Sequence, residues 1–395
     1  MLNSPEVGGS AGLFDRKALY GGPALASESS FAFLSRASGD FWRRTRELAE
    51  AWYAHYPDTN GDLRARFRKD ELRQHVAAWF ELYVFSLFRL LGYQVEVHPA
   101  LRGTSKRPDF LVTRDSHSAY IECTALVDSS EWTDSDCGAW LLDCLNGAHN
   151  PDFMVDLSVE QIGTQRPRAR EIAGPVEQWL AKLNWGDVSS QIAAGMDAPT
   201  NPFEFRDWKI RLEAWPVVAD RRGKPGRLVG SHLIGNENPR HDEDDVRRLL
   251  AKKGSYYGLQ ARPLVLAVLN WSGFIDEHDV TNALFGSVVV RYYQGGVNMP
   301  PPKQVRLQDG YWRPRGSTRG SRVAGVLFSD RLLKPWNPTS ALPLLWVNPW
   351  APERLPTMPP FGVRTAGESG RIQSTAPLRT AADVLKIRWD SDGEE

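Results

Sequence analysis

The sequence is poor in cysteine and in long apolar runs. Its 395 residues include three cysteines, with no CxxC pair and no histidine at a metal-binding spacing, namely Cys123, Cys137 and Cys144. This pattern excludes a disulfide framework and a zinc site, and it is typical of reduced thiols in a cytoplasmic protein. The longest apolar run, PLVLAVLNW, is far too short to span a bilayer. We therefore expect a cytoplasmic protein with no membrane segment.

The chain also lacks a net charge and a recognisable targeting segment. Lysine plus arginine and aspartate plus glutamate both number 48, so the formal net charge is zero. The chain as a whole is not attracted to nucleic acid, and any such binding must come from local patches. The first residues, MLNSPEVGGSAGLF, lack the basic and apolar regions of a secretion signal. No recognition helix, zinc finger or aromatic RNA-binding signature is present.

Residues 70–126 predict one buried helix followed by three strands. The helix, expected at 70–93, has a broad apolar face and a glycine near its end. The strands are expected at 93–99, 108–113 and 119–126, joined by short polar loops. The last strand is apolar on both faces, which is typical of a central strand.

Three acidic residues fall inside these apolar elements. Glu81 lies in the middle of the helix, Asp109 follows Pro108 at a strand start, and Glu122 lies in the next strand. A buried, unpaired carboxylate costs several kcal/mol or shifts its pKa until it is neutral. A shared divalent cation would stabilise such a group, and Mg²⁺ usually takes one or two carboxylates with water and substrate phosphate.

The order of these acids resembles the PD-(D/E)xK nuclease superfamily, which has the restriction-endonuclease-like fold. The matching motifs are PDF at 108–110 and IECT at 121–124, and longer stretches such as KKGSYYGLQARPLVLAVLNW resemble a bacterial branch with threonine in the third motif. The likeness implies an α/β core, a mixed central sheet flanked by helices. It also implies hydrolysis of DNA with Mg²⁺ or Mn²⁺, in defence or DNA repair. Asp109, Glu122 and Glu81 would bind the metal.

The position of the superfamily's catalytic lysine is occupied here by Thr124, whose hydroxyl carries no charge. A helix expected at 242–258 contains Lys253 and Tyr257, which are four residues apart and share a helix face. One branch of the superfamily presents a Q-x-x-x-Y pair from such a helix. The resemblance therefore implies that Lys253 takes the place of that glutamine and brings the missing ammonium to the site.

A purely structural interpretation stays open for each of these residues. Glu81 could be a helix acid bonded to arginine or tyrosine, and Asp109 could cap the turn after Pro108. Lys253 could be a solvated lysine at a helix end. The alternative function is then a catalytically inactive restriction-like module that binds nucleic acid or a partner protein. A third option is a different enzyme that uses the same carboxylates. Whether Lys253 reaches the acids separates the first two readings.

Basic loops supply the candidate contacts to DNA phosphates. The first set, in the loop beside Asp109, is Arg102, Lys106 and Arg107. Thr124 and Tyr257 of the expected site are further candidate contacts to the nucleic acid. A second set lies on an expected hairpin tip and comprises Arg221, Arg222, Lys224 and Arg227. A third is the segment 313–322. Such loops are also commonly solvated surface. Restriction-like nucleases often act as dimers, so a homodimer or a protein partner is also expected, although no dimer seam is recognisable.

Composition and periodicity divide the chain into five parts. Glycine, serine and alanine dominate the beginning, helical periodicity follows, and proline, glycine and arginine dominate the end. The expected parts are a flexible arm at 1–30, an N-terminal helical segment at 31–69, a restriction-endonuclease-like core at 70–126 and 242–290, an insertion with helices and a hairpin at 127–241, and an irregular C-terminal extension at 291–395. In the insertion we expect a helix at 168–185 with a break at Gly174-Pro175, and a hairpin that pairs 207–219 with the segment after the basic turn. In the extension we expect one or two edge strands.

Overall fold

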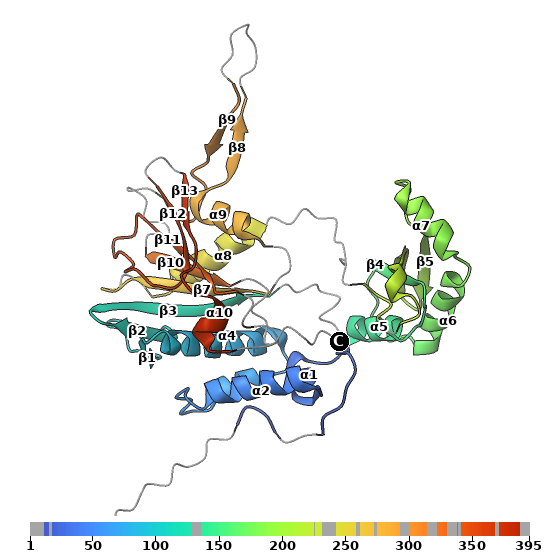
Figure 1. Cartoon of the computed structure of the whole chain (residues 1–395), viewed down its shortest axis with the longest axis horizontal. Coiled ribbons are helices and arrows are strands. Elements are labelled where there is room, and N and C mark those ends of the chain that lie inside the picture. Colours follow the sequence, from blue (N-terminus) through green and yellow to red (C-terminus); the bar gives the residue numbers. More distant parts are fainter. Residues whose placement is uncertain are drawn as a thin grey trace, which may run out of the picture. The chain divides into compact units, whose positions relative to one another are not determined.

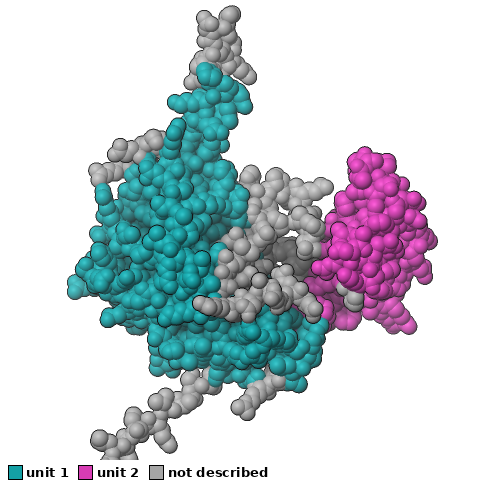
Figure 2. Space-filling model, in the orientation of Figure 1, with its two compact units in different colours: residues 1–22, 30–128, 241–395 teal, residues 23–29, 129–240 magenta. Residues whose placement is uncertain are grey.

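The chain forms two compact units. The computed structural model describes residues 12–15, 18–127, 136–224, 226–230, 242–257, 261–271, 275–292, 301–313, 322–329, 338, 341–367 and 371–387. Unit 1 comprises residues 1–22, 30–128 and 241–395, and unit 2 comprises residues 23–29 and 129–240 (Figure 2). Unit 2 covers nearly the span expected as the insertion, and the segments on both sides of it build unit 1.

A mixed sheet is the centre of unit 1 (Figure 1). In the described residues its order is β1-β2-β3-β7-β10-β11-β12-β13. The strands β3, β7 and β10 are mutually parallel, and β1, β2 and β3 form an antiparallel meander. The bounds are β1 Gln94–Val97, β2 Phe110–Arg114, β3 His117–Leu126, β7 Leu264–Asn270, β10 Val323–Ser329, β11 Leu344–Val347, β12 Gly362–Ala366 and β13 Ile372–Thr375.

Helices cover both faces of this sheet, so the expected mixed α/β class with a large flanked sheet is confirmed. On one face α4 packs against β1, β3 and β7, and four further helices pack against α4. On the other face α8 packs against β3 and β7, with α9 beside it. The bounds are α1 Ser30–Arg36, α2 Asp40–Tyr53, α3 Asp62–Phe67, α4 Leu72–Leu90, α8 Asp242–Gly254, α9 Glu277–Phe285 and α10 Ala381–Leu385.

The two apolar cores follow from the alternation of side chains along the central strands. Ile121 and Ala125 of β3 face the core beneath α4, whereas Tyr120 faces the core beneath α8 and α9. All seven residues of β7 are buried, which is why its sequence is a continuous apolar run. Consequently, polar side chains of β3 that point toward α8 come to lie between a helix and a buried sheet.

The expectation of an irregular C-terminal extension with one or two edge strands is wrong. β10 is fully buried and lies between β7 and β11 inside the sheet. Its sequence, VAGVLFS, is apolar on both faces, which is the pattern of a central strand. Proline and glycine fill the connections and obscured that pattern. A separate two-stranded ribbon, β8 Val288–Arg291 with β9 Lys303–Arg306, precedes it.

The expected flexible arm at 1–30 is wrong for its described part near Leu13. Leu13 is fully buried in the core that contains α4. The backbone N–H groups of Leu13 and Phe14 donate to the Glu50 carboxylate at 3.1 and 2.8 Å. Residues 1–11 lie outside the described part of the chain. The burial of Leu13 and the hydrogen bonds to Glu50 therefore fix this segment, although the glycine-rich sequence around it predicted a flexible arm.

Unit 2 is a three-stranded antiparallel sheet with the order β4-β6-β5. Its helices pack on the face that carries Val155 and Leu212, and together they form a third core. The bounds are α5 Asp136–Asn146, β4 Phe153–Gln161, α6 Ala169–Leu180, α7 Trp185–Ala193, β5 Thr200–Phe205, β6 Trp208–Pro216 and the 3₁₀ turn η1 Ala219–Arg221.

Two expectations for unit 2 are wrong. The hairpin partner of β6 is β5, connected through Arg206-Asp207, and not the segment after the basic turn at 221–226. The helix α6 continues through Pro175, where a break was expected. Ile172 and Val176 on either side of this position are fully buried, and this packing holds the helix together despite the missing backbone donor. Within the described residues no helix combines the length and the apolar character needed to cross a membrane.

Candidate active site

Strand pairing places Asp109 and Glu122 next to each other. Phe110 of β2 pairs with Ile121 of β3, so Asp109 and Glu122 stand at the following register position. The Asp109 Oδ2 atom accepts a hydrogen bond from the backbone N–H of Cys123 at 2.6 Å. Glu122 is 5% exposed, and its side chain points toward α8, opposite to its neighbours Ile121 and Cys123.

The helix α8 delivers a lysine to this pair of acids. Lys253 Nζ lies 2.8 Å from Glu122 Oε1. The hydroxyl of Tyr257, four residues later, donates to Glu122 Oε2. The expected shared helix face is wrong, because α8 ends at Gly254 and Tyr257 lies beyond it. Both side chains nevertheless contact one carboxylate, and Lys253 is not the solvated helix-end lysine of the structural interpretation. Its side chain keeps 30% of its surface exposed, which leaves the ammonium open to solvent on one side.

The charges of the site are unevenly compensated. Burial raises the pKa of Asp109 well above its ordinary value, and the carboxylates of Glu122 and Glu81 raise it further. Burial alone would lower the pKa of Lys253, but the carboxylates of Glu122 and Asp109 outweigh it and raise that pKa. Burial and Glu122 also raise the pKa of Tyr257, so its hydroxyl keeps its proton and donates. The site therefore combines a firmly protonated ammonium with an aspartate whose neutral form is favoured by burial and by the neighbouring carboxylates.

Glu81 reaches the same electrostatic neighbourhood from α4 but is already engaged. Its Oε2 atom accepts from Arg66 at 2.8 Å, and its Oε1 atom accepts from the Tyr56 hydroxyl. Glu81 is 3% exposed. The structural interpretation, a helix acid bonded to arginine and tyrosine, therefore describes its contacts. Arg66 precedes Glu81 by 15 residues, and no periodicity in the sequence connects the two.

Thr124, two residues after Glu122, is 9% exposed. It pairs with Val268 of β7 and lies on the same face of the strand as Glu122. Its hydroxyl adds no charge to the site. The cation at this face comes from α8, on the side of the sheet to which Thr124 and Glu122 point.

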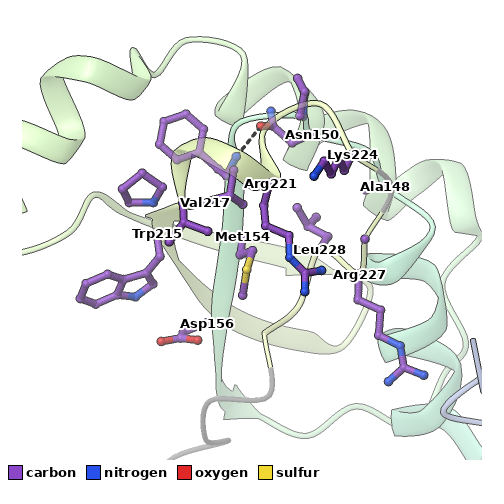
Figure 3. Close-up of a pocket in the computed structure, with 15 residues that line it drawn as sticks. Ala148, Asn150, Met154, Asp156, Trp215, Val217, Arg221, Lys224, Arg227 and Leu228 are labelled. Atoms are coloured by element: carbon purple, nitrogen blue, oxygen red, sulfur yellow. Dashed lines mark hydrogen bonds between the residues drawn. The ribbon is translucent and has the colours of Figure 1, made fainter. Parts of the chain in front are cut away.

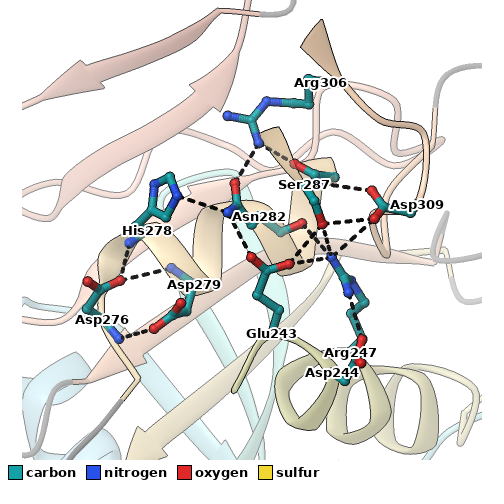
Figure 4. Close-up of polar contacts among 11 residues, drawn as sticks. Glu243, Asp244, Arg247, Asp276, His278, Asp279, Asn282, Ser287, Arg306 and Asp309 are labelled. Carbon is teal, nitrogen blue, oxygen red and sulfur yellow. Dashed lines mark hydrogen bonds and ion pairs between the residues drawn. The ribbon is translucent and has the colours of Figure 1, made fainter. Parts of the chain in front are cut away.

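A polar network fixes α8 in place (Figure 4). Glu243, in its first turn, accepts from Asn282 of α9 at 2.8 Å and from Arg247 at 2.7 Å. The Ser287 hydroxyl lies 2.9 Å from Glu243 and donates to Asp309 at 2.8 Å. These bonds join α8 to α9 and to the base of the β8–β9 ribbon. They determine the position of α8 along the sheet and therefore the position of Lys253.

Close packing fixes the other end of α8. A Cβ atom at Gly254 would lie 2.0 Å from the Tyr311 hydroxyl and 2.7 Å from Val323 Cγ2. Tyr311 is 5% exposed and Val323 is fully buried, so neither can move into solvent. Only glycine lets the helix approach this closely immediately after Lys253.

The basic loop beside Asp109 is attached to the end of α8. The Tyr257 hydroxyl lies 3.2 Å from the Arg107 carbonyl oxygen, and Lys106 Nζ lies 3.5 Å above the ring of Tyr256. Arg102, Lys106 and Arg107 are all exposed. The first set of candidate phosphate contacts therefore borders the carboxylates, as its place in the sequence indicated.

The second basic set lies in unit 2, and most of the third lies outside the described residues. Arg222 of the second set donates to Asp152 at 2.8 Å and lies 4.5 Å from the ring centroid of Trp185. This set is in unit 2 and does not form a hairpin tip. Of the third set, at 313–322, the structure describes Arg313, at the start of the segment, and Arg322, at its end; the rest lies outside the described residues.

The donor atoms of the site fit a hard divalent cation. Mg²⁺ and Mn²⁺ bind carboxylate oxygens and need only one or two of them when water and phosphate complete the shell. Asp109 and Glu122 are neighbouring carboxylates whose mutual repulsion raises the pKa of Asp109, and a cation would relieve that repulsion. Among the described residues no group of three or more His, Cys, Asp or Glu side chains is arranged to hold a metal ion.

Comparison of the chain with family models, with curated proteins and with solved structures gave no match. The assignment of the site therefore depends on its own geometry. Sequence reasoning missed Tyr56 and Arg66, the partners of Glu81, and the main-chain donor at Cys123. The pairing of β2 with β3 could have indicated the Cys123 donor, because Cys123 follows Glu122, the residue opposite Asp109.

Proposed function

We propose that unit 1 is a restriction-endonuclease-like module of the PD-(D/E)xK type that hydrolyses DNA phosphodiester bonds with Mg²⁺ or Mn²⁺. The observation that carries the proposal is the distance of 2.8 Å between Lys253 Nζ and Glu122 Oε1. It supports a cation supplied from α8 in place of the lysine that Thr124 replaces. The order of the acids along a helix and a β-hairpin adds to this support.

Each side chain has a defined task in this proposal. Asp109 and Glu122 would hold the metal, and Glu81 would support it from α4. A divalent cation bound there would polarise the scissile phosphate and lower the pKa of an attacking water. Lys253 would orient that water and offset the charge that develops on the phosphate. Arg102, Lys106 and Arg107 would hold the DNA backbone against the rim of the site, with Thr124 and Tyr257 close to the substrate.

A second candidate function is a catalytically inactive restriction-like module that binds nucleic acid or a partner protein. It is favoured by the fact that both Glu122 oxygens already accept hydrogen bonds, from Lys253 and from Tyr257. A carboxylate oxygen has two lone pairs, so each oxygen can accept one bond and still bind a metal. The occupancy therefore favours the inactive module without blocking a metal, and a DNA cleavage assay separates the two functions.

Plasmid and linear DNA cleavage in the presence of Mg²⁺ or Mn²⁺ tests the proposal. We expect the wild-type protein to nick or cut DNA and Glu122→Gln to be inactive. Lys252→Met is the matched control for Lys253→Met, because Lys252 is the neighbouring lysine and is exposed. Cleavage that survives Glu122→Gln would remove the site assignment. Metal binding without any cleavage would favour the inactive module.

A further inference from the structure

Unit 2 contains a cavity that has no part in the proposed cleavage site. It has a volume of about 710 Å³, and part of its lining, Met154 and Trp215, is on the sheet face opposite to the helices (Figure 3). This volume is within the range of about 300–1,000 Å³ that is typical of small-molecule and cofactor sites. We call it the unit 2 cavity; it is lined by Ala148, Asn150, Pro151, Phe153, Met154, Asp156, Trp215, Pro216, Val217, Val218, Arg221, Lys224, Gly226, Arg227 and Leu228.

An aromatic and apolar surface forms one wall of the cavity. Met154 of β4 and Trp215 of β6 are directly paired across the strands, so their side chains lie together on the same sheet face. Trp215 is 38% exposed and Val218 is 65% exposed. The opposite face, with Val155 and Leu212, is covered by helices. Exposed apolar side chains gathered in a cavity are typical of a binding surface.

Cationic side chains also line the cavity. They come from the segment 221–227, and in Figure 3 Arg221 extends among Met154, Val217 and Leu228. The lining residues include three cations, Arg221, Lys224 and Arg227, and one anion, Asp156, so their formal charge is 3 − 1 = +2. The cavity is therefore positive in a chain whose formal net charge is zero.

The cationic segment is held in place by a residue that does not line the cavity. Arg222 is bonded to Asp152 and stacked on Trp185, and the Gly223 N–H donates to the Pro151 carbonyl at 3.0 Å. Arg221 and Lys224, on either side of this anchor, are exposed. The backbone is thus fixed, and the two flanking cations are available to a ligand.

We infer that the unit 2 cavity binds one nucleotide of a single-stranded nucleic acid. The base lies against Trp215 and Met154, and the phosphate lies at Arg221 and Lys224. Single-strand binding sites combine an aromatic stacking surface with cations that follow the backbone. Asp156 adds an acceptor for the N–H groups of a base. The ligand class rests on the proposed function, because it assigns unit 2 to binding an unpaired strand of the nuclease substrate.

Binding to a labelled strand in EDTA, where no metal-dependent cleavage occurs, tests the inference. The probe is a fluorescein-labelled oligothymidylate of about 12 nucleotides, within the usual site size of such proteins, and the readout is fluorescence anisotropy with the full chain. We expect Arg221→Gln/Lys224→Gln and Trp215→Leu each to weaken binding about tenfold, since one stacked base typically contributes that much or more. The double variant should also reduce the salt dependence by about 1.4 in log–log slope.

The matched control is Arg170→Gln/Lys182→Gln, which removes two exposed cations of unit 2 that do not line the cavity. It should bind the probe as the wild type does. Equal binding by all variants would overturn the inference, and so would a loss in Trp215→Leu no larger than in the control. Displacement by thymidine monophosphate and inorganic phosphate at equal concentrations would overturn it as well, because the base would then contribute nothing.

This test is independent of cleavage. If the proposed function fails, Glu122→Gln and wild type cleave DNA equally, and probe binding still depends on Trp215. If the inference fails, the probe binds without regard to Trp215, Arg221 and Lys224, and cleavage still depends on Glu122.

Discussion

Replacement of Lys253 by methionine removes the positive charge that lies against the Glu122 carboxylate. At an effective dielectric constant of about 20, two unit charges 2.8 Å apart attract by about 6 kcal/mol, and desolvation offsets most of this. Breaking a buried pair costs about 3–5 kcal/mol. Solvent screening of the 30% exposed lysine side chain reduces the cost. We expect Lys253→Met to lose about 2 kcal/mol of unfolding free energy in EDTA.

The same substitution should behave differently when metal is bound. A divalent cation at Asp109 and Glu122 would compensate the negative charge that Lys253 compensates in its absence. The stability loss should therefore shrink in saturating Mn²⁺, while DNA cleavage falls by about a hundredfold or more, as for other groups that stabilise the charge developing in the transition state. Urea unfolding with and without Mn²⁺ and a plasmid nicking assay measure both quantities.

Lys252→Met provides the control and should change stability by less than about 0.5 kcal/mol. In the Lys253→Met background, Thr124→Lys returns a cation to the face of β3 that carries Glu122, and it should restore part of the cleavage. The reasoning is refuted if Lys253→Met cleaves DNA like the wild type. It is also refuted if the stability loss is the same with and without Mn²⁺.

Three further predictions follow from the structure. Gly254→Ala should displace α8 from Tyr311 and reduce cleavage more than tenfold, as one ångström of misplacement can cost about a hundredfold. Burial lowers the pKa of His75 from its ordinary value of about 6.5, which holds in the unfolded chain, to about 4 in the folded protein. The neutral His75 therefore contributes fully to folding stability above about pH 6.5, and this contribution is lost as the pH falls through about 4. This amounts to about 3 kcal/mol at about 1.4 kcal/mol for each tenfold change in proton affinity. Arg102→Gln/Arg107→Gln should weaken binding to duplex DNA and reduce the salt slope by about 1.8.

The first two of these predictions have matched controls. Ser255→Ala, one residue further along at an exposed position, should leave cleavage unchanged where Gly254→Ala reduces it. Urea unfolding between pH 4 and 7 should show a flatter pH dependence for His75→Gln than for wild type. The exposed His55 provides the comparison, and a His55→Gln profile as flat as that of His75→Gln would contradict the assignment. An unchanged salt slope in Arg102→Gln/Arg107→Gln would contradict a phosphate role for the loop.

The parts of the fold that local patterns determine were predictable from the sequence. A helix at 72–90 and the strands β2 and β3 follow from apolar periodicity. The helix expected at 242–258 is wrong in its end, because α8 ends at Gly254 and Tyr257 lies beyond it, although Lys253 and Tyr257 both contact Glu122. The partners of Glu81 were not predictable, because Tyr56 and Arg66 meet it only through the packing of three helices.

The errors have a common physical origin in long-range packing. β10 is a central strand because it pairs with β7, which precedes it by more than 50 residues. The proline-rich connections around β10 made its strand pattern hard to recognise in the sequence. Leu13 is fixed because its side chain is buried in the core of unit 1. The helix α6 continues through Pro175 because Ile172 before it and Val176 after it are buried. In each case tertiary burial outweighed the local propensity on which the expectation rested.

Metal-dependent cleavage of plasmid DNA by wild type and Glu122→Gln tests the central claim most directly. The account predicts that purified wild-type protein nicks supercoiled DNA in Mg²⁺ or Mn²⁺ and stops in EDTA. It also predicts that Glu122→Gln, although folded, is inactive under all three conditions. Cleavage by Glu122→Gln at the wild-type rate, or wild-type cleavage that continues in EDTA, would contradict it.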